Sequence, residues 1–227
     1  TMDDWQFKTL TILLVLPIRL EDVSGLIISD VDFNKQQIHF GNRFGGLDFN
    51  KGKVDVKFPL PDELIPLLQM SVGERLEGPL FLNRKICHGT TSIKYVFSST
   101  SDLEQQCQNE LSNAPKGTVQ NSQDRKKVIR DFLKKAGGLT STYVGKQLRQ
   151  VIGKDEAGRP YDLRGSNTQE MKESGIPLLE LRYLTEHSFN DIITVYSGLN
   201  PKQEIVKYYN KISPLLEAIK TRTEQLV

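Results

Sequence analysis

Strand-like alternation of apolar and polar residues is confined to one short stretch of this chain. Residues 31–33, 37–40 and 54–58 alternate in this way, and the turn-rich segment 41–52 separates the last two. Period-two alternation is typical of strands that cover a core with one face. We therefore expect an α+β fold, a mainly helical domain with a small antiparallel sheet near its N-terminal part.

Helices are predicted along most of the remaining chain. Apolar spacing, capping residues and Gly or Pro boundaries define them. Asp62 is the expected cap of one, and another is expected to be basic, with Val128, Phe132 and Leu133 on its apolar face. Within residues 98–123 we expect an insertion or mobile loop. The predicted helices span 7–15, 21–28, 62–70, 102–111, 123–136, 140–152, 163–174, 177–185 and 190–196, and 201–227 carries one apolar face.

Composition narrows the class of protein. The two cysteines, Cys87 and Cys107, form no Cys-x-x-Cys pattern and predict neither a disulfide framework nor a zinc site. The apolar run 10–16 is far shorter than the ~20 residues of a membrane helix. We expect a cytoplasmic protein without a metal or cofactor.

The net charge of the 227 residues is only +2, so a basic surface would have to come from local clusters of Lys and Arg. Local clusters can follow the phosphates of a nucleic acid, or can be an ordinary solvated surface. The two clusters are Arg125, Lys126, Lys127, Arg130, Lys134 and Lys135, and Lys51, Lys53 and Lys57.

Five reactive side chains occur in local contexts that indicate a shared chemistry. They are Arg19, Lys51, Arg164, His187 and Tyr196. Arginine forks bind two oxygens of a phosphodiester, lysine and histidine transfer protons, and a phenol can act as the nucleophile. Each residue alone has an ordinary structural explanation, but their joint order and spacing favour the catalytic one.

The contexts of these residues resemble the motifs of the tyrosine recombinases, the phage-integrase family. The resemblance runs from about Leu13 to about Asn200. It is carried by Arg19-Leu20-Glu21-Asp22 with Ser29-Asp30-Val31-Asp32, by Lys51 eight residues ahead of Pro59, and by Tyr161-Asp162-Leu163-Arg164, Leu184-Thr185-Glu186-His187-Ser188 and Thr194-Val195-Tyr196.

Three positions depart from the family pattern. Tyr161 stands where the family has the histidine of its His-x-x-Arg box, and Glu186 replaces the glycine of Leu-Gly-His. The lead-in to Arg19 is Leu16-Pro17-Ile18 instead of Thr-Gly-Leu. We expect Tyr161 to orient the phosphate or Tyr196 without acting as a base.

The resemblance implies a site-specific recombinase or integrase of a phage or mobile element. Arg19 and Arg164 would hold the scissile phosphate, and Tyr196 would form a 3′-phosphotyrosine link without metal or ATP. Lys51 would protonate the leaving 5′ hydroxyl, with Lys53 as its rival, and His187 would assist. Tyr208 and Tyr209 are rival tyrosines outside the nucleophile box.

The resemblance also implies an organisation. Residues 1–200 would be the catalytic domain, and 201–227 a tail that packs on a neighbouring protomer or folds back on its own domain. Expected partners are double-stranded DNA and further copies, in a ring of four, near the nucleoid of a prokaryotic or viral host cell. Another DNA-binding domain would precede Thr1 in the full-length protein. Two alternatives stay open, a degenerate DNA-binding relative and a relaxing enzyme of the type IB topoisomerase kind.

Overall fold

The computed structural model describes residues 2–43, 47–48, 56–93, 95–115, 117–153, 160–185 and 200–226. Its elements in chain order are α1 (Asp4–Val15), α2 (Leu20–Gly25), the 3-10 turn η1 (Ile28–Asp30), β1 (Val31–Asp32), β2 (Gln37–Phe40), β3 (Asn42–Arg43), β4 (Leu47–Asp48), β5 (Val56–Pro59), α3 (Leu64–Val72), α4 (Arg84–Cys87), α5 (Thr100–Ser112), α6 (Ser122–Lys135), α7 (Ser141–Ile152), α8 (Pro160–Glu173), α9 (Leu178–Leu184), α10 (Pro201–Lys211) and α11 (Ser213–Glu224).

The predicted antiparallel sheet is present, so the α+β fold class is confirmed. Its strands lie in the order β1-β2-β5, with Val31 opposite Ile38 and Ile38 opposite Phe58. Ile38, Val56 and Phe58 are fully buried, as alternation on a one-sided sheet requires. A second pair, β3 with β4, lies in the turn-rich segment 41–52.

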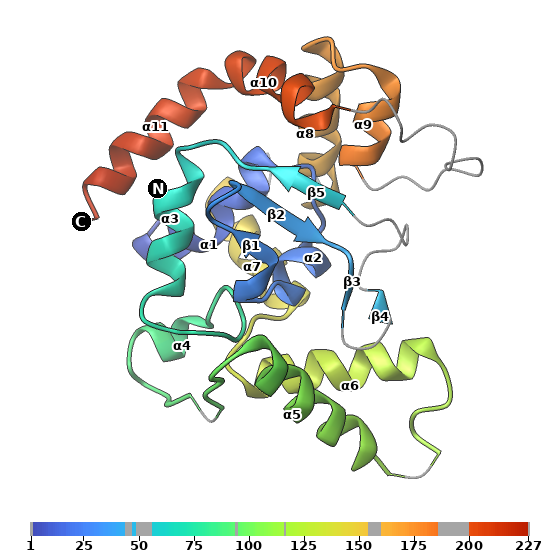
Figure 1. The fold of residues 1–227 in the computed structure, drawn as a ribbon. Coiled ribbons are helices and arrows are strands. Elements are labelled where there is room, and N and C mark those ends of the chain that lie inside the picture. The colour runs from blue at the N-terminus through green and yellow to red at the C-terminus, as the bar shows by residue number, and fades with distance from the viewer. Residues whose placement is uncertain are drawn as a thin grey trace.

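Helix α1 lies at the centre of the molecule, behind the three-stranded sheet (Figure 1). Helices α3, α7 and α8 pack against it. Its Leu10, Ile12 and Val15 are almost fully buried, because a helix that is apolar on most sides needs neighbours on most sides. The helix begins three residues earlier than predicted, since Asp3 and Gln6 form a reciprocal capping box.

Two sequence predictions at element ends are wrong. The helix expected over 21–28 ends at Gly25, because the Leu26 carbonyl accepts from Leu80 N–H (2.9 Å) and Ile28 N–H donates to Gly78 (2.9 Å). Asp62 does not cap α3, because its carboxylate accepts from the Gln36 side-chain amide at 2.7 Å. In both cases the polar group forms its hydrogen bond with a residue distant in sequence instead of within the expected helix.

Helices α5 and α6 pack against each other as an arm with a small core of its own (Figure 1). The helix expected over 102–111 is therefore confirmed, two residues earlier at its start; that 98–123 is an insertion stays a prediction. On α6, Ile129 is fully buried and Val128 only partly, which corrects the expected apolar face. The core of this α5–α6 arm consists of Ile27, Phe97, Leu103, Cys107, Ile129, Phe132, Leu133 and Ala136.

The two cysteines are unbridged. Cys87 is exposed and Cys107 is buried in the arm, where burial raises the pKa of its thiol to about 12. Within the described ranges no group of three or more His, Cys, Asp or Glu is placed to hold a metal ion. None of the helices in those ranges has the length and apolarity needed to cross a membrane.

The C-terminal tail folds back on its own chain. Helix α10 packs on α8, α9 and β5, and α11 packs on α3. Of the predicted apolar face, Ile205, Tyr208, Leu216 and Ile219 are buried, and Ile212 lies at the break between the helices. The break precedes Pro214, which is tolerated in the first turn of α11 but not within a helix.

Gly138 offers a test of how tightly the arm is joined to the rest of the fold. A Cβ at Gly138 would lie 2.8 Å from the Leu133 carbonyl oxygen and 3.1 Å from Pro79 carbons. Gly138→Ala should lower the free energy of unfolding by about 1–3 kcal/mol, because backbone cannot yield as a flexible side chain can. Urea unfolding measures it.

Gly165→Ala is the matched control. Gly165 lies within α8, and a Cβ at this position would have no heavy atom from outside the helix within 4 Å. Alanine should therefore leave stability unchanged or raise it by about 0.5–1 kcal/mol. Equal effects of the two substitutions would contradict the close packing at Gly138.

Candidate functional site

Arg19 lies where the chain leaves α1 and enters α2. It has an extended backbone (φ −92°, ψ 160°), and its N–H donates to the Asp22 carboxylate at 2.6 Å. That bond satisfies one of the free donors at the start of α2. Asp22 therefore fixes the backbone of Arg19, and the side chain of Arg19 is left half-buried at the surface.

Arg164 comes from the other half of the chain, on α8, and is only 5% exposed. Its guanidinium Nη2 donates to the backbone carbonyl of Thr185, the residue at the C-terminal end of α9. Thr185 is itself buried, and its hydroxyl donates to the Leu181 carbonyl (2.8 Å). Arg164 thus fixes the point from which the chain proceeds toward His187 and Tyr196.

The positive charges of Arg19 and Arg164 both act on the carboxyl group of Asp22. This carboxyl is 5% exposed, and burial raises its pKa above the ordinary value. The Arg19 N–H and the positive charges of Arg19 and Arg164 act in the opposite direction and lower it. A buried carboxylate offsets part of the repulsion between two nearby guanidinium groups. The arrangement gathers two permanent cations, which suits the binding of an anion with several oxygens.

The end of α1, just before Arg19, is held by a side chain of α8. The Leu13 carbonyl would accept from the N–H of residue 17, but Pro17 has none. Instead the side-chain amide of Asn167 donates to the carbonyls of Leu13 and Leu16, both at 3.0 Å. Asn167 is buried and lies three residues after Arg164, so one face of α8 sets both the end of α1 and the position of Arg164.

A second side chain completes this cap from α10. The Val15 carbonyl would accept from Arg19 N–H, which is bound to Asp22 instead. The hydroxyl of Tyr208 donates to it at 2.8 Å. The Tyr209 hydroxyl donates to the Pro59 carbonyl at 2.5 Å, and burial raises the pKa of both phenols. The hydroxyl groups of both rival tyrosines are therefore engaged in hydrogen bonds to backbone carbonyls.

Sequence reasoning missed Asn167 and the structural role of Tyr208. One signal was present in the sequence: Pro17 removes a donor at the end of a buried helix, so some side chain has to supply one. Which side chain supplies it depends on the packing of α8 and α10, and no periodicity in the sequence reveals that.

A surface groove of about 940 Å³ opens between α2 and α7, and on the α2 side it is lined by Leu20 and Glu21, the two residues that follow Arg19. Gly145 permits this close approach, because a Cβ there would lie 3.0 Å from the Leu20 side chain. The exposed face of α7 lines the groove with Thr142, Lys146, Arg149 and Gln150. Across the described part of the chain, neither Lys146 nor Arg149 forms an ion pair, so both cations face solvent.

Three of the predicted site residues lie outside the described residues. They are Lys51, His187 and Tyr196, and Lys53, the rival of Lys51, lies outside them as well. The backbone of Tyr161 belongs to the first turn of α8, but its side chain is also outside the described part. Of the six predicted residues, the structure therefore describes the side chains of Arg19 and Arg164, whose charges both act on Asp22, and the roles of all six stay predictions.

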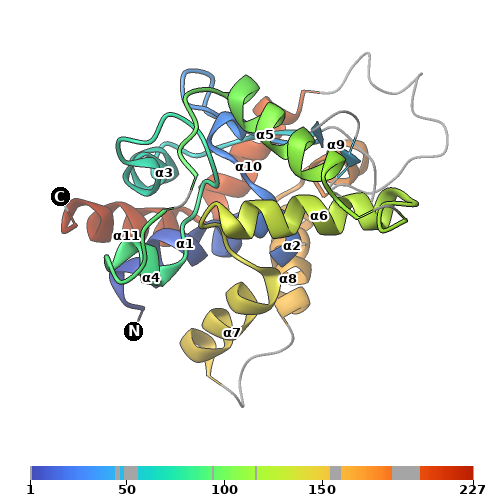
Figure 2. The same ribbon diagram turned by 90° about the horizontal axis from the view of Figure 1, so that it is seen from below.

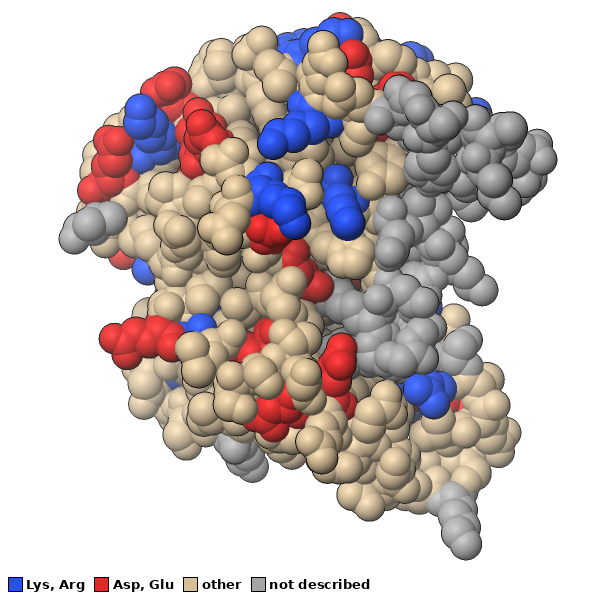
Figure 3. Space-filling model, in the orientation of Figure 1, with Lys and Arg blue, Asp and Glu red and all other residues tan. Residues whose placement is uncertain are grey.

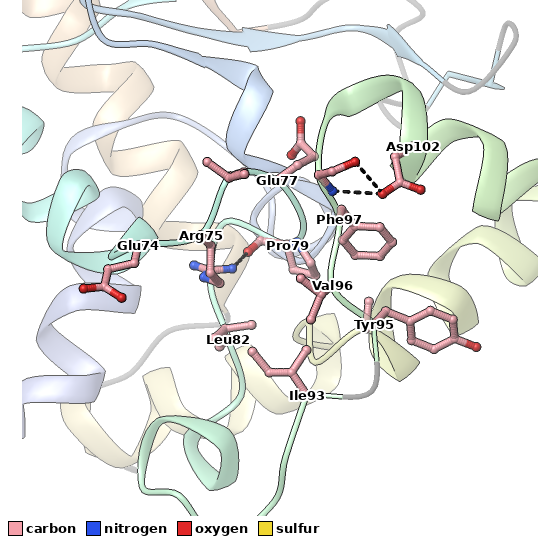
Figure 4. Close-up of a pocket in the computed structure, with 13 residues that line it drawn as sticks. Glu74, Arg75, Glu77, Pro79, Leu82, Ile93, Tyr95, Val96, Phe97 and Asp102 are labelled. Carbon is pink, nitrogen blue, oxygen red and sulfur yellow. Dashed lines mark hydrogen bonds between the residues drawn. The ribbon is translucent and has the colours of Figure 1, made fainter.

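A separate cavity of about 450 Å³ lies beside the α5–α6 arm and contains none of the predicted residues (Figure 4). Its one guanidinium, that of Arg75, donates to the carbonyls of Ser71 (2.6 Å), Leu80 (3.0 Å) and Pro79. Burial lowers the pKa of Arg75. This arginine closes the loop after α3, and its donors are not directed at a ligand.

No family model and no curated protein sequence matches the chain. Among solved structures, it is similar to the Tn1549 transposon integrase in complex with transposon right-end DNA, with a TM-score of 0.46 and 13% identity over 95% of this chain and 58% of that one. The same integrase in complex with a circular intermediate DNA gives a TM-score of 0.42 and 13% identity, over 93% and 57%. The chain thus spans a little over half the length of these integrase chains.

Asn167→Asp tests the cap on α1. An ionised carboxylate has no donor for the Leu13 and Leu16 carbonyls, so the free energy of unfolding at pH 7 should fall by about 2–5 kcal/mol. The loss should shrink as the pH falls through the raised pKa of the introduced carboxyl, since its protonated form regains an O–H donor. Urea unfolding at neutral and acidic pH measures both effects.

Asn210→Asp makes the same chemical change on the exposed face of α10 and should alter stability by less than about 0.5 kcal/mol. If the two variants lost equal stability, the Asn167 amide would have no special role.

Proposed function

We propose that this chain is the catalytic region of a DNA strand transferase of the tyrosine-recombinase type. It would cut and rejoin DNA through a covalent 3′-phosphotyrosine intermediate, without metal or ATP. The observation that supports the proposal is that the positive charges of Arg19 and Arg164 both act on the buried Asp22 carboxyl, whose oxygen also accepts from the Arg19 N–H. These arginines belong to two separate sequence motifs that resemble the same family.

Two fixed guanidinium groups suit the chemistry of phosphodiester cleavage. Attack on phosphorus builds negative charge on the non-bridging oxygens, and each planar fork can bind two of them. Donors that are already oriented need no reorganisation during the reaction, and each can be worth about 3 kcal/mol of barrier. Asp22 holds the backbone of Arg19, and the Thr185 carbonyl holds the guanidinium of Arg164.

The proposed nucleophile is Tyr196. Its hydroxyl oxygen would bond to phosphorus, the 5′ oxygen would leave, and Lys51 would give that oxygen a proton. His187 would assist the phosphate or the transfer. The involvement of Tyr208 and Tyr209 in buried hydrogen bonds supports Tyr196 over these rivals. Attack by a 5′ hydroxyl reverses the step and rejoins the strand.

The groove between α2 and α7 supports DNA as the substrate. Lys146 and Arg149 project from α7 along this groove, and their charges suit the phosphates on either side of the scissile one. Hydroxyl and amide side chains such as Thr142 and Gln150 can bind phosphate oxygens or base edges. Association of several copies on DNA is also part of this proposal; within the single chain, the tail packs on α8, α9, β5 and α3.

A trapped covalent adduct tests the proposed function. The protein is incubated with supercoiled plasmid and nicked duplexes in the absence of divalent metal, then denatured with detergent. DNA should remain bound to the protein, and Tyr196→Phe should abolish the adduct, because the phenylalanine ring has no nucleophilic oxygen.

Tyr143→Phe is the matched control. It removes a hydroxyl from a ring that packs edge-on against Trp5, and the adduct should persist. Exchanged strands and Holliday junctions indicate a recombinase, whereas relaxed circles alone indicate the topoisomerase alternative. Measurable DNA binding without an adduct would assign the chain to the degenerate DNA-binding alternative.

The role of Tyr161 is tested by Tyr161→Phe and Tyr161→His. If the hydroxyl orients the phosphate or Tyr196, the phenylalanine variant should form adduct roughly ten- to a hundredfold more slowly, since a hydrogen bond to a charged group is worth ~1.5–3 kcal/mol. The histidine variant should gain a pH dependence near ~6.5 from the introduced imidazole, in addition to any that His187 gives the parent. Adduct formation by the phenylalanine variant at the parent rate would remove the hydroxyl from the mechanism.

A further inference from the structure

Helix α6 presents a line of cations that the proposed cleavage site does not use. We infer that Lys127, Arg130 and Lys134, named here the α6 stripe, form a second contact surface for the DNA backbone. The inference rests on the proposed function, because it takes DNA as the substrate. It extends that function by assigning a partner surface to the α5–α6 arm, away from Arg19 and Arg164.

The three residues lie on one side of the helix. Their spacing of three and four residues places them in a row about 10 Å long, and the fully buried Ile129 and Phe132 point to the other side. Each residue of the stripe is exposed. In the view of Figure 2, α6 crosses the near side of the molecule.

In the described part of the chain, none of the three residues of the stripe forms an ion pair with a carboxylate. Lys135, on an adjacent side of the helix, does pair with Glu110 on α5 (2.8 Å). Asp131 flanks the stripe without such a bond, and the Asp124 carboxylate accepts from Gln120 N–H at 3.1 Å. Three cations without partners favour an external anion over an internal salt-bridge network.

The arm holds this face rigidly and separates its charges. The Phe132 ring packs edge-on against Tyr95 and Phe97, at centroid distances of 5.6 and 5.9 Å. Helix α5 covers the apolar side of α6 and has three acidic and no basic residues, whereas α6 has six basic and two acidic ones. In Figure 3 acidic side chains mark the surface in the region of α5. The arm is therefore polarised, with α6 as its basic side.

A short and fixed connection joins the stripe to the cleavage site. The α6 helix ends at Lys135, and Gly137 and Gly138 lead into α7, whose Lys146 and Arg149 line the groove between α2 and α7. The Gly137 carbonyl accepts from the backbone and side chain of Asn83 (2.8 and 3.2 Å). These bonds hold the junction between the two helices to the segment before α4.

The test compares two triple variants of the full chain in DNA binding. The first is Lys127→Gln/Arg130→Gln/Lys134→Gln, which keeps good helix formers. The control is Lys172→Gln/Lys202→Gln/Lys220→Gln, which removes the same charge from exposed positions on α8, α10 and α11. Fluorescence anisotropy with a duplex of about 30 base pairs, from about 50 to 200 mM salt, gives affinity and its salt dependence.

The stripe variant should bind DNA about tenfold or more weakly at about 100 mM salt, with the slope of log K against log salt reduced in magnitude by about 2–3. The control should stay within about twofold of the parent, and both should keep the parent's thermal midpoint. Equal losses in the two variants would overturn this inference alone. If the stripe variant kept the parent's DNA affinity but lost binding to anionic phosphatidylserine vesicles, the stripe would be a membrane-binding surface. That result would overturn the inference as well. Failure of the parent protein to bind DNA would overturn the proposed function together with the inference.

Discussion

The carbonyl end of α1 is closed by side chains from distant parts of the chain, and the placement of the candidate site depends on this. Pro17 and the diverted N–H of Arg19 leave carbonyls without their helical partners. Asn167 and Tyr208 supply the missing donors from α8 and α10. Buried carbonyls need such partners, so the central helix cannot be packed without fixing the turn that carries Arg19. Stability and site geometry are consequently coupled.

Asp22 links that turn to α8 by charge. One carboxylate binds the backbone of Arg19 and lies in the field of both Arg19 and Arg164, although burial works against its ionisation. Burial of a charge costs free energy that only close and well-directed partners offset. A cluster of this kind is poorly suited to stabilising a fold by itself. Its two arginines bring two permanent positive charges to one buried carboxyl.

Charge is distributed locally in this protein, as the net charge of only +2 requires. Lys146 and Arg149 line the groove between α2 and α7, and the α6 stripe lies on the basic side of the arm.

Most helix and strand segments were predictable, because burial of one face makes apolar residues recur at a regular spacing in the sequence. The errors at 21–28, Asp62 and Val128 lie where a distant partner, such as the backbone of residues 78–80, competes for a group or a face.

The sequence by itself determined the α+β class, the positions of most helices, and the ordered motifs that name Arg19, Lys51, Tyr161, Arg164, His187 and Tyr196 as candidates. These follow from local periodicity and spacing, which are visible in the order of the residues along the chain. Only the tertiary structure decided that the charges of Arg19 and Arg164 both act on the Asp22 carboxyl. It also decided that Asn167 and Tyr208 cap α1 and that the tail folds back on its own chain. The physical reason is that hydrogen bonds and charges act through space, between residues whose separation along the chain carries no periodic signal.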